Sequence, residues 1–82
     1  MQNYNRQRDL PRVYCLWSDE LGDDLPSRVR LIPKLERACR SERQRGIANH
    51  WAYDLSRHKA MLAMLNEERR AVIAMWAKDH AL

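Results

Sequence analysis

Three side chains near the middle of the chain have the spacing of a metal site. His50, Asp54 and His58 recur every four residues, so on a helix they fall within about 80° of arc. Two imidazoles and a carboxylate are ligands that zinc accepts. A further ligand would have to come from His80 or a cysteine, whereas Asp54 and His58 also suit an ordinary i, i+4 pair. We therefore predict no metal and no other cofactor.

The candidate nucleophiles lack the neighbours that activate such groups. None of the four serines considered lies in a nucleophile elbow or a glycine-rich loop; these are Ser18, Ser27, Ser41 and Ser56. Cys39 has Arg37 and Arg40 close by in the sequence, but it shares a helical face with apolar residues. A phosphate-binding loop needs several glycines, and the chain has only two. A chain of 82 residues also has little core from which to build a cleft. We expect no enzymatic activity.

Basic side chains are predicted to line one helix, and we name them the basic ridge. They recur every few residues over 30–45, and they are Arg30, Lys34, Arg37, Arg40 and Arg45. A ridge of this kind suits the phosphates of DNA or RNA, with salt-dependent binding, or an acidic protein. It is equally typical of a solvated helix face, here partly neutralised by Glu36 and Glu42.

The same region has the outline of a helix-turn-helix. A helix over 33–45, a turn with Gly46 and a second helix from 48 have the expected order. Trp51 and Leu55 lie in the first turns of the second helix, however, and require burial. The second helix therefore fits a recognition helix poorly.

Methionines and alanines make the last third of the chain apolar around much of a helix. Met61, Met64 and Trp76 are expected to form a face that contacts another chain, because methionine adapts to irregular partners. The alternative is that further helices of the same bundle surround this segment. Both arrangements require the elements that position these side chains to be helical.

The composition favours an all-α fold. There are two glycines and no threonine, too few turn-forming and β-branched residues for a β-rich fold. We predict a small three- or four-helix bundle or helical hairpin with a long C-terminal helix. Residues 1–9 are expected to form a flexible polar arm, and 10–82 a single helical domain.

Three helical tracts are expected, with Gly22 and Gly46 at helix ends. The first runs from 10 to 21 after an N-cap at Asp9, and the second runs from 25 to 45 with a break or kink at Pro33. The third runs from 48 to 80. These bounds follow from the period of the apolar residues.

The third tract carries a heptad stripe of residues spaced alternately four and three apart. The stripe consists of Trp51, Leu55, His58, Leu62, Leu65, Arg69, Val72 and Trp76. One helix over 48–80 would be about 48 Å long, more than the rest of the chain can cover. The helix therefore either breaks at Asn66 or continues and is covered by a second copy. We favour continuity and a homodimer.

Charge and the cysteines set the expected location and partner. The formal net charge is +4, the N-terminus has no apolar signal region, and no window approaches the roughly 18 apolar residues of a membrane span. Cys15 and Cys39 are expected to be buried, reduced thiols. We predict a cytoplasmic regulatory, adaptor or inhibitor protein that binds another protein, one of acidic character, through Met61, Met64 and Trp76 and the basic ridge. The alternative is a small DNA- or RNA-associated regulator that uses the ridge.

Overall fold

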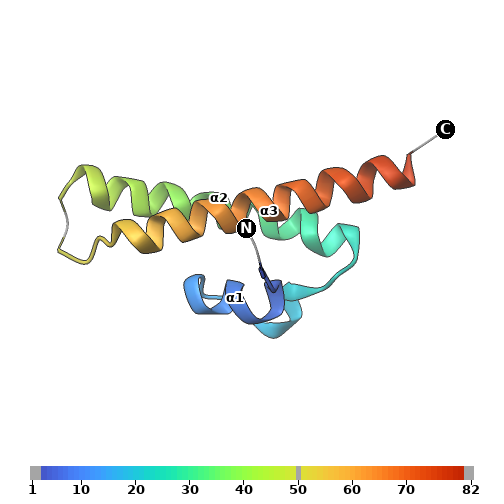
Figure 1. The fold of residues 1–82 in the computed structure, drawn as a ribbon, viewed down its shortest axis with the longest axis horizontal. Helices are drawn as coiled ribbons and strands as arrows, with labels where there is room; N and C mark the ends of the chain where they lie inside the picture. Colours follow the sequence, from blue (N-terminus) through green and yellow to red (C-terminus); the bar gives the residue numbers. More distant parts are fainter. Residues whose placement is uncertain (1–2, 50, 81–82) are drawn as a thin grey trace.

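The computed structural model describes residues 3–49 and 51–80. They form three α-helices and one 3-10 turn, namely α1 (Arg6–Val13), η1 (Ser18–Leu21), α2 (Leu25–Ile47) and α3 (Leu55–Asp79). Figure 1 shows α2 and α3 as an antiparallel hairpin, with α1 and η1 together on one side of it. The predicted all-α hairpin with a long C-terminal helix is therefore confirmed.

Helix α1 begins earlier than predicted because a different residue caps it. The Asn5 side chain accepts a hydrogen bond from the Arg8 amide, and the Asn5 amide donates to Asp9, so the helix starts at Arg6. The predicted start at Leu10 is wrong, and the segment predicted as an arm includes the first half of α1. The chain is extended at Tyr14, so the continuous helix predicted over 10–21 is also wrong.

Helix α2 runs through Pro33 without interruption, so of the predicted break or kink, the break is wrong. Asp24 caps its start by accepting from the Ser27 amide. Leu31 and Leu35, on either side of the proline, are both buried in the core. Tertiary packing of these two leucines outweighs the backbone hydrogen bond that proline removes.

The connection between α2 and α3 is longer than predicted. Asp54 accepts from the Arg57 amide and makes Leu55 the first residue of α3, so residues 48, 49 and 51–54, which were predicted to be helical, are not. Trp51 lies in this connection and is 91% exposed, although the heptad stripe predicted its burial.

Gly46 is inside α2, with φ negative, and the ring of Tyr53 lies so close that an added Cβ would be 2.9 Å from it. Glycine is therefore needed here for close approach and not for a left-handed turn.

Helix α3 continues through Asn66 to Asp79, so the predicted continuity is confirmed. Its 25 residues make it about 37 Å long. In Figure 1 its C-terminal end extends past the start of α2. No helix in the described parts of the chain is long and apolar enough to cross a membrane.

The core lies where α1, η1, α2 and α3 meet. Its buried apolar residues are Leu10, Tyr14, Leu21, Leu31, Leu35, Cys39, Met61, Met64 and Leu65. Cys39 is buried as predicted, but Cys15 is exposed. Cys15 follows the end of α1 on an extended segment, so no helix turns it toward the core.

A buried carboxylate joins α1 to α3. Glu68 is 2% exposed and accepts hydrogen bonds from the Tyr4 hydroxyl at 2.9 Å and from Arg6 Nη2 at 3.0 Å. Arg28 Nη1 of α2 lies 4.0 Å away. Arg6 also donates to the Leu21 carbonyl at 2.7 Å. Burial and, secondarily, the hydrogen bond to Glu68 raise the pKa of Tyr4, which keeps its hydroxyl a donor. This cluster fixes which side of the hairpin α1 covers.

Candidate functional site

The two sides of α2 face different surroundings. One row of positions (34, 38, 41 and 45) lines a cavity shared with Tyr14 and Cys15, the residues that follow α1. A second row (36, 39, 40 and 43) lines a groove to which only α2 and α3 contribute. We call the first the covered side and the second the open face of the α2–α3 hairpin. The rows follow from the three- and four-residue spacing of a helix.

The groove of the open face has an apolar floor. Its lining residues are Glu36, Cys39, Arg40, Arg43, His58, Leu62, Leu65 and Arg69, and its volume is about 470 Å³. Cys39 and Leu65 are buried and form the floor. Leu62 is 44% exposed at the α3 wall, so the groove presents apolar surface to whatever enters it.

Exposed apolar side chains extend the open face along both helices. On α3 they share one side of the helix and are Leu55, Leu62, Ile73 and Trp76. On α2, Val29 lies one heptad before Glu36 and Ile47 lies one heptad after Arg40, so both continue the groove-lining row. The face therefore runs nearly the length of the hairpin.

An ion pair across the groove sets the register of the two helices. Arg69 Nη2 lies 2.9 Å from Glu36 Oε2. In an antiparallel pair, one heptad from this contact brings Val29 level with Trp76, and one heptad the other way brings Arg43 level with Leu62. The open face is consequently apolar at its ends and charged in its middle.

The charge in the middle of the open face is mostly positive. Glu36 is engaged by Arg69, while Arg40 and Arg43 form no ion pair with any residue in the ranges 3–49 and 51–80. The Nδ1 atom of His58 lies 3.0 Å from the Tyr53 hydroxyl, which orients the imidazole at the edge of the groove. Two arginines therefore remain available to a carboxylate or phosphate.

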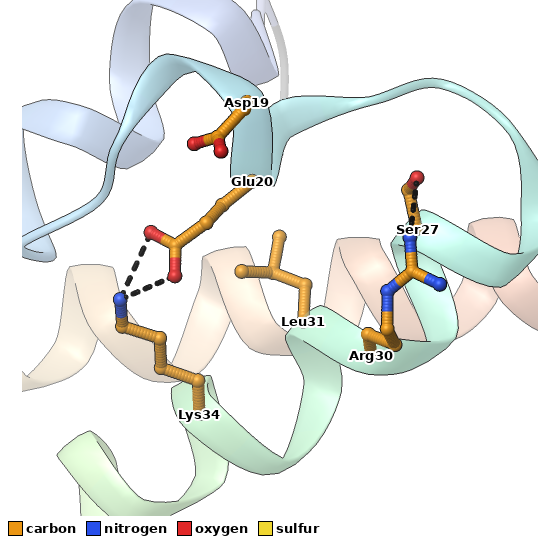
Figure 2. Close-up of a pocket in the computed structure, with 6 residues that line it drawn as sticks. All are labelled: Asp19, Glu20, Ser27, Arg30, Leu31 and Lys34. Carbon is orange, nitrogen blue, oxygen red and sulfur yellow. Dashed lines mark hydrogen bonds and ion pairs between the residues drawn. The ribbon is translucent and has the colours of Figure 1, made fainter.

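A second pocket, between η1 and α2, is polar and contains an ion pair of its own. It has a volume of about 300 Å³ and is lined by Asp19, Glu20, Ser27, Arg30, Leu31 and Lys34. Figure 2 shows Lys34 reaching the Glu20 carboxylate, at 2.7 and 2.9 Å, and Arg30 directed at the Ser27 hydroxyl, at 3.2 Å. The hydrogen bond from Lys34 holds the pKa of Glu20 below its usual range. The Lys34–Glu20 pair fastens η1 to α2, whereas the contact between Arg30 and Ser27 lies within α2.

The basic ridge is split by these contacts. Lys34 is held by Glu20 and Arg45 by Glu42, at 3.3 Å, and Arg30 by Ser27. Arg37 is exposed, and Arg40 lines the groove. The structure therefore does not bring the five side chains together as one free surface.

The predicted methionine face is wrong in its position. Met61 is 2% and Met64 5% exposed, so both belong to the core beneath α1. The Tyr14 hydroxyl donates to the Met61 carbonyl at 2.8 Å. Trp76 is exposed as predicted and stacks on His80 with ring centroids 4.2 Å apart. The neighbouring apolar stripe of α3, which includes Leu62, is the one that remains on the surface.

The exposed stripe was visible in the sequence but was assigned to the wrong set of residues. Leu55, Leu62 and Trp76 belong to the predicted heptad stripe, and these three members of it are exposed on the open face. Ile73 and Arg43 were not among the predicted binding residues. The signal that finds them is helical spacing and not residue type, because Ile73 lies three residues before Trp76 and Arg43 lies seven residues after Glu36.

The residues considered for metal binding have other partners. Asp54 caps α3 and His58 contacts Tyr53, while His50 lies outside the described residues. No group of three possible metal ligands occurs within 3–49 and 51–80. The arrangement that the structure does show is an amphipathic groove with an apolar floor and arginines at its edge.

Comparison with known proteins adds no further assignment. No protein-family model, no curated protein and no solved structure matches this chain.

Proposed function

We propose that this protein is a non-catalytic regulatory, adaptor or inhibitor protein that holds a helix of another protein against its open face. The observation that carries this proposal is the gathering of exposed apolar side chains on the one side of the hairpin that α1 and η1 leave uncovered. Helices bury apolar stripes by packing in layers, and a third long helix would complete such a layer here.

The apolar area available suits a reversible contact. Full burial of a large apolar side chain is worth about 1.5–3 kcal/mol, and six such side chains of the open face start from half-exposed positions. Association costs about 4–15 kcal/mol in lost freedom. The balance is small, as expected of a partner that is exchanged and not permanently bound.

Nucleic-acid binding through the basic ridge has less support. A duplex is held by several cations that are free to reach phosphates, whereas Lys34 and Arg45 of the ridge are engaged within the chain. A homodimer through the open face is the other rival. The proposed cytoplasmic location agrees with both cysteines being free thiols.

Site-specific photo-crosslinking in the producing cells tests the proposal. A photoreactive residue at Leu62, on the open face, should join the chain to one discrete protein, while the same residue at Ser56, exposed on another side of α3, should not. Leu62→Glu should abolish co-purification of that protein without lowering helicity. Equal crosslinking from both positions, adducts only with nucleic acid, or adducts only with a second copy would each contradict the proposal.

A further inference from the structure

We infer that the partner segment is an acidic amphipathic helix, apolar at its two ends and carboxylate-bearing in its middle. This inference rests on the proposed function and specifies the partner of the same open face. It follows from the order in which apolar and charged groups occur along the groove.

The middle of the groove requires negative charge. Three arginines line it (Arg40, Arg43 and Arg69) against one carboxylate, Glu36, which Arg69 already binds at 2.9 Å. Arg40 and Arg43 are exposed beside the buried apolar floor, where a docked partner would exclude solvent from them. Guanidinium groups there form strong, often bidentate hydrogen bonds with carboxylates.

The two ends of the open face require apolar side chains on the partner helix. The register set by Glu36 and Arg69 places Val29 with Ile73 and Trp76 at one end, and Ile47 with Leu55 at the other. From Leu55 to Trp76, α3 rises about 32 Å at 1.5 Å per residue. A helix of about 21 residues, three heptads, matches that length. Its outer heptads meet the apolar ends and its central heptad meets the arginines.

A second copy of the chain fits this face less well. An antiparallel two-fold pairing would bring the central Arg40 and Arg43 of one copy against the same basic stretch of the other, and like charges in an interface are unfavourable. Nucleic acid would satisfy the arginines but not the exposed Val29, Ile73 and Leu55. An acidic helix satisfies both kinds of group.

Selection from a displayed peptide library tests the inference without knowledge of the natural partner. The full 82-residue chain is the bait, and the library holds helical peptides of about 21 residues with fixed apolar heptad positions. The flanking positions are free to be Glu, Gln or Lys. Selected peptides should be enriched in Glu in the central heptad and show no such enrichment in the outer two.

Charge reversal on α2 sharpens the selection. The double variant Arg40→Glu, Arg43→Glu should weaken the selected acidic peptides about tenfold or more and should shift a repeated selection toward Lys. Arg37→Glu is the matched control, since Arg37 is exposed on α2 but does not line the groove; it should leave affinity within about twofold. Circular dichroism of each variant checks that the helices persist.

The outcomes separate this inference from the proposed function. Peptides selected without a central Glu bias, or with a Lys bias, overturn the acidic-helix inference but leave a peptide-binding face standing. The inference fails if no peptide of any charge is selected. It also fails if duplex DNA displaces the selected peptides, or if sedimentation shows that the chain forms dimers that block the groove. The proposed function then depends on the crosslink at Leu62 alone.

Discussion

The covered side and the open face of the hairpin both carry arginines, but these arginines have different partners. On the covered side, Arg6 and Arg57 reach carboxylates that are themselves buried, Glu68 and Glu42. On the open face, Arg40 and Arg43 line a groove without a carboxylate partner among the described residues. The two pairs of arginines therefore differ in whether a second element brings them a buried acid.

The apolar residues of α3 divide in the same way. Met61 and Met64 are buried on the covered side, whereas Leu55, Ile73 and Trp76 are exposed on the open face. The two stripes have similar hydrophobicity. What distinguishes them is whether a neighbouring helix covers them, so a substitution should affect stability on one side and partner binding on the other.

Removal of the Glu68 carboxylate should have the largest effect. Glu68→Ala leaves the nearly buried Arg6 without its main partner, and breaking a buried pair costs about 3–5 kcal/mol. That is a large part of the stability of a small domain. Urea denaturation followed by circular dichroism measures the loss.

Asp23→Ala is the matched control for this prediction, because Asp23 pairs with the same Arg6 at 3.2 Å but is 79% exposed. It should cost less than about 1 kcal/mol. Similar losses in the two variants would show that burial of the carboxylate does not distinguish them.

Truncation of two adjacent residues of α3 should lower the free energy of unfolding by very different amounts. Met61→Ala opens a cavity in the core and should destabilise the fold by about 2–5 kcal/mol. Leu62→Ala, one position on and at the surface, should change the free energy of unfolding by less than about 1 kcal/mol. Thermal and urea unfolding of both variants measure the difference; a larger loss for Leu62→Ala would mean that the core side of α3 is wrongly placed.

Loss of one hydroxyl on the covered side should have a smaller effect. Tyr14→Phe removes the hydrogen bond to the Met61 carbonyl, at 2.8 Å, and the contact with Cys39 Sγ, at 3.2 Å. One intramolecular hydrogen bond contributes about 0.5–1.5 kcal/mol, so the urea midpoint should fall modestly with the helicity unchanged. An unchanged midpoint would indicate that the hydroxyl contributes no net stability.

Acid should weaken the ion pair between η1 and α2 and the caps of α1 and α2, and this effect should be the smallest of those predicted here. Lys34 holds the pKa of Glu20 low, Arg8 and then the Asn5 amide lower that of Asp9 to about 2, and Ser27 lowers that of Asp24. Because the folded pKa values lie below the unfolded ones, the stabilisation is complete above about pH 4.5 and is lost as the pH falls toward 2.

Urea midpoints measured at several pH values between about 6 and 2 test whether stability falls as these carboxylates become protonated. Glu20→Gln should show a shallower decline than the unmodified chain. A midpoint that rises on acidification would contradict the assigned ion pairs, since these carboxylates would then favour the unfolded state.

Local features of the sequence predicted the helices but not all of their ends. The scarcity of glycine and the apolar period predicted a helical hairpin, and α2 and α3 have that form. The start of α1 was missed because Asn5 and Asp9 are both acceptable caps, and only the structure shows which amide each engages. The break predicted at Pro33 failed because burial of the neighbouring leucines outweighed a local preference.

The sequence by itself determined that this chain is helical and that α3 carries two apolar stripes, because helix propensity and a period of 3.6 residues are properties of neighbouring residues. Only the tertiary structure decided which stripe is core. That choice depends on where α1 lies, and Glu68 holds α1 through Tyr4 and Arg6, more than 60 residues away in the chain. The same placement leaves Leu62, Trp76 and the arginines of the groove uncovered, and it thereby creates the open face on which the proposed function rests.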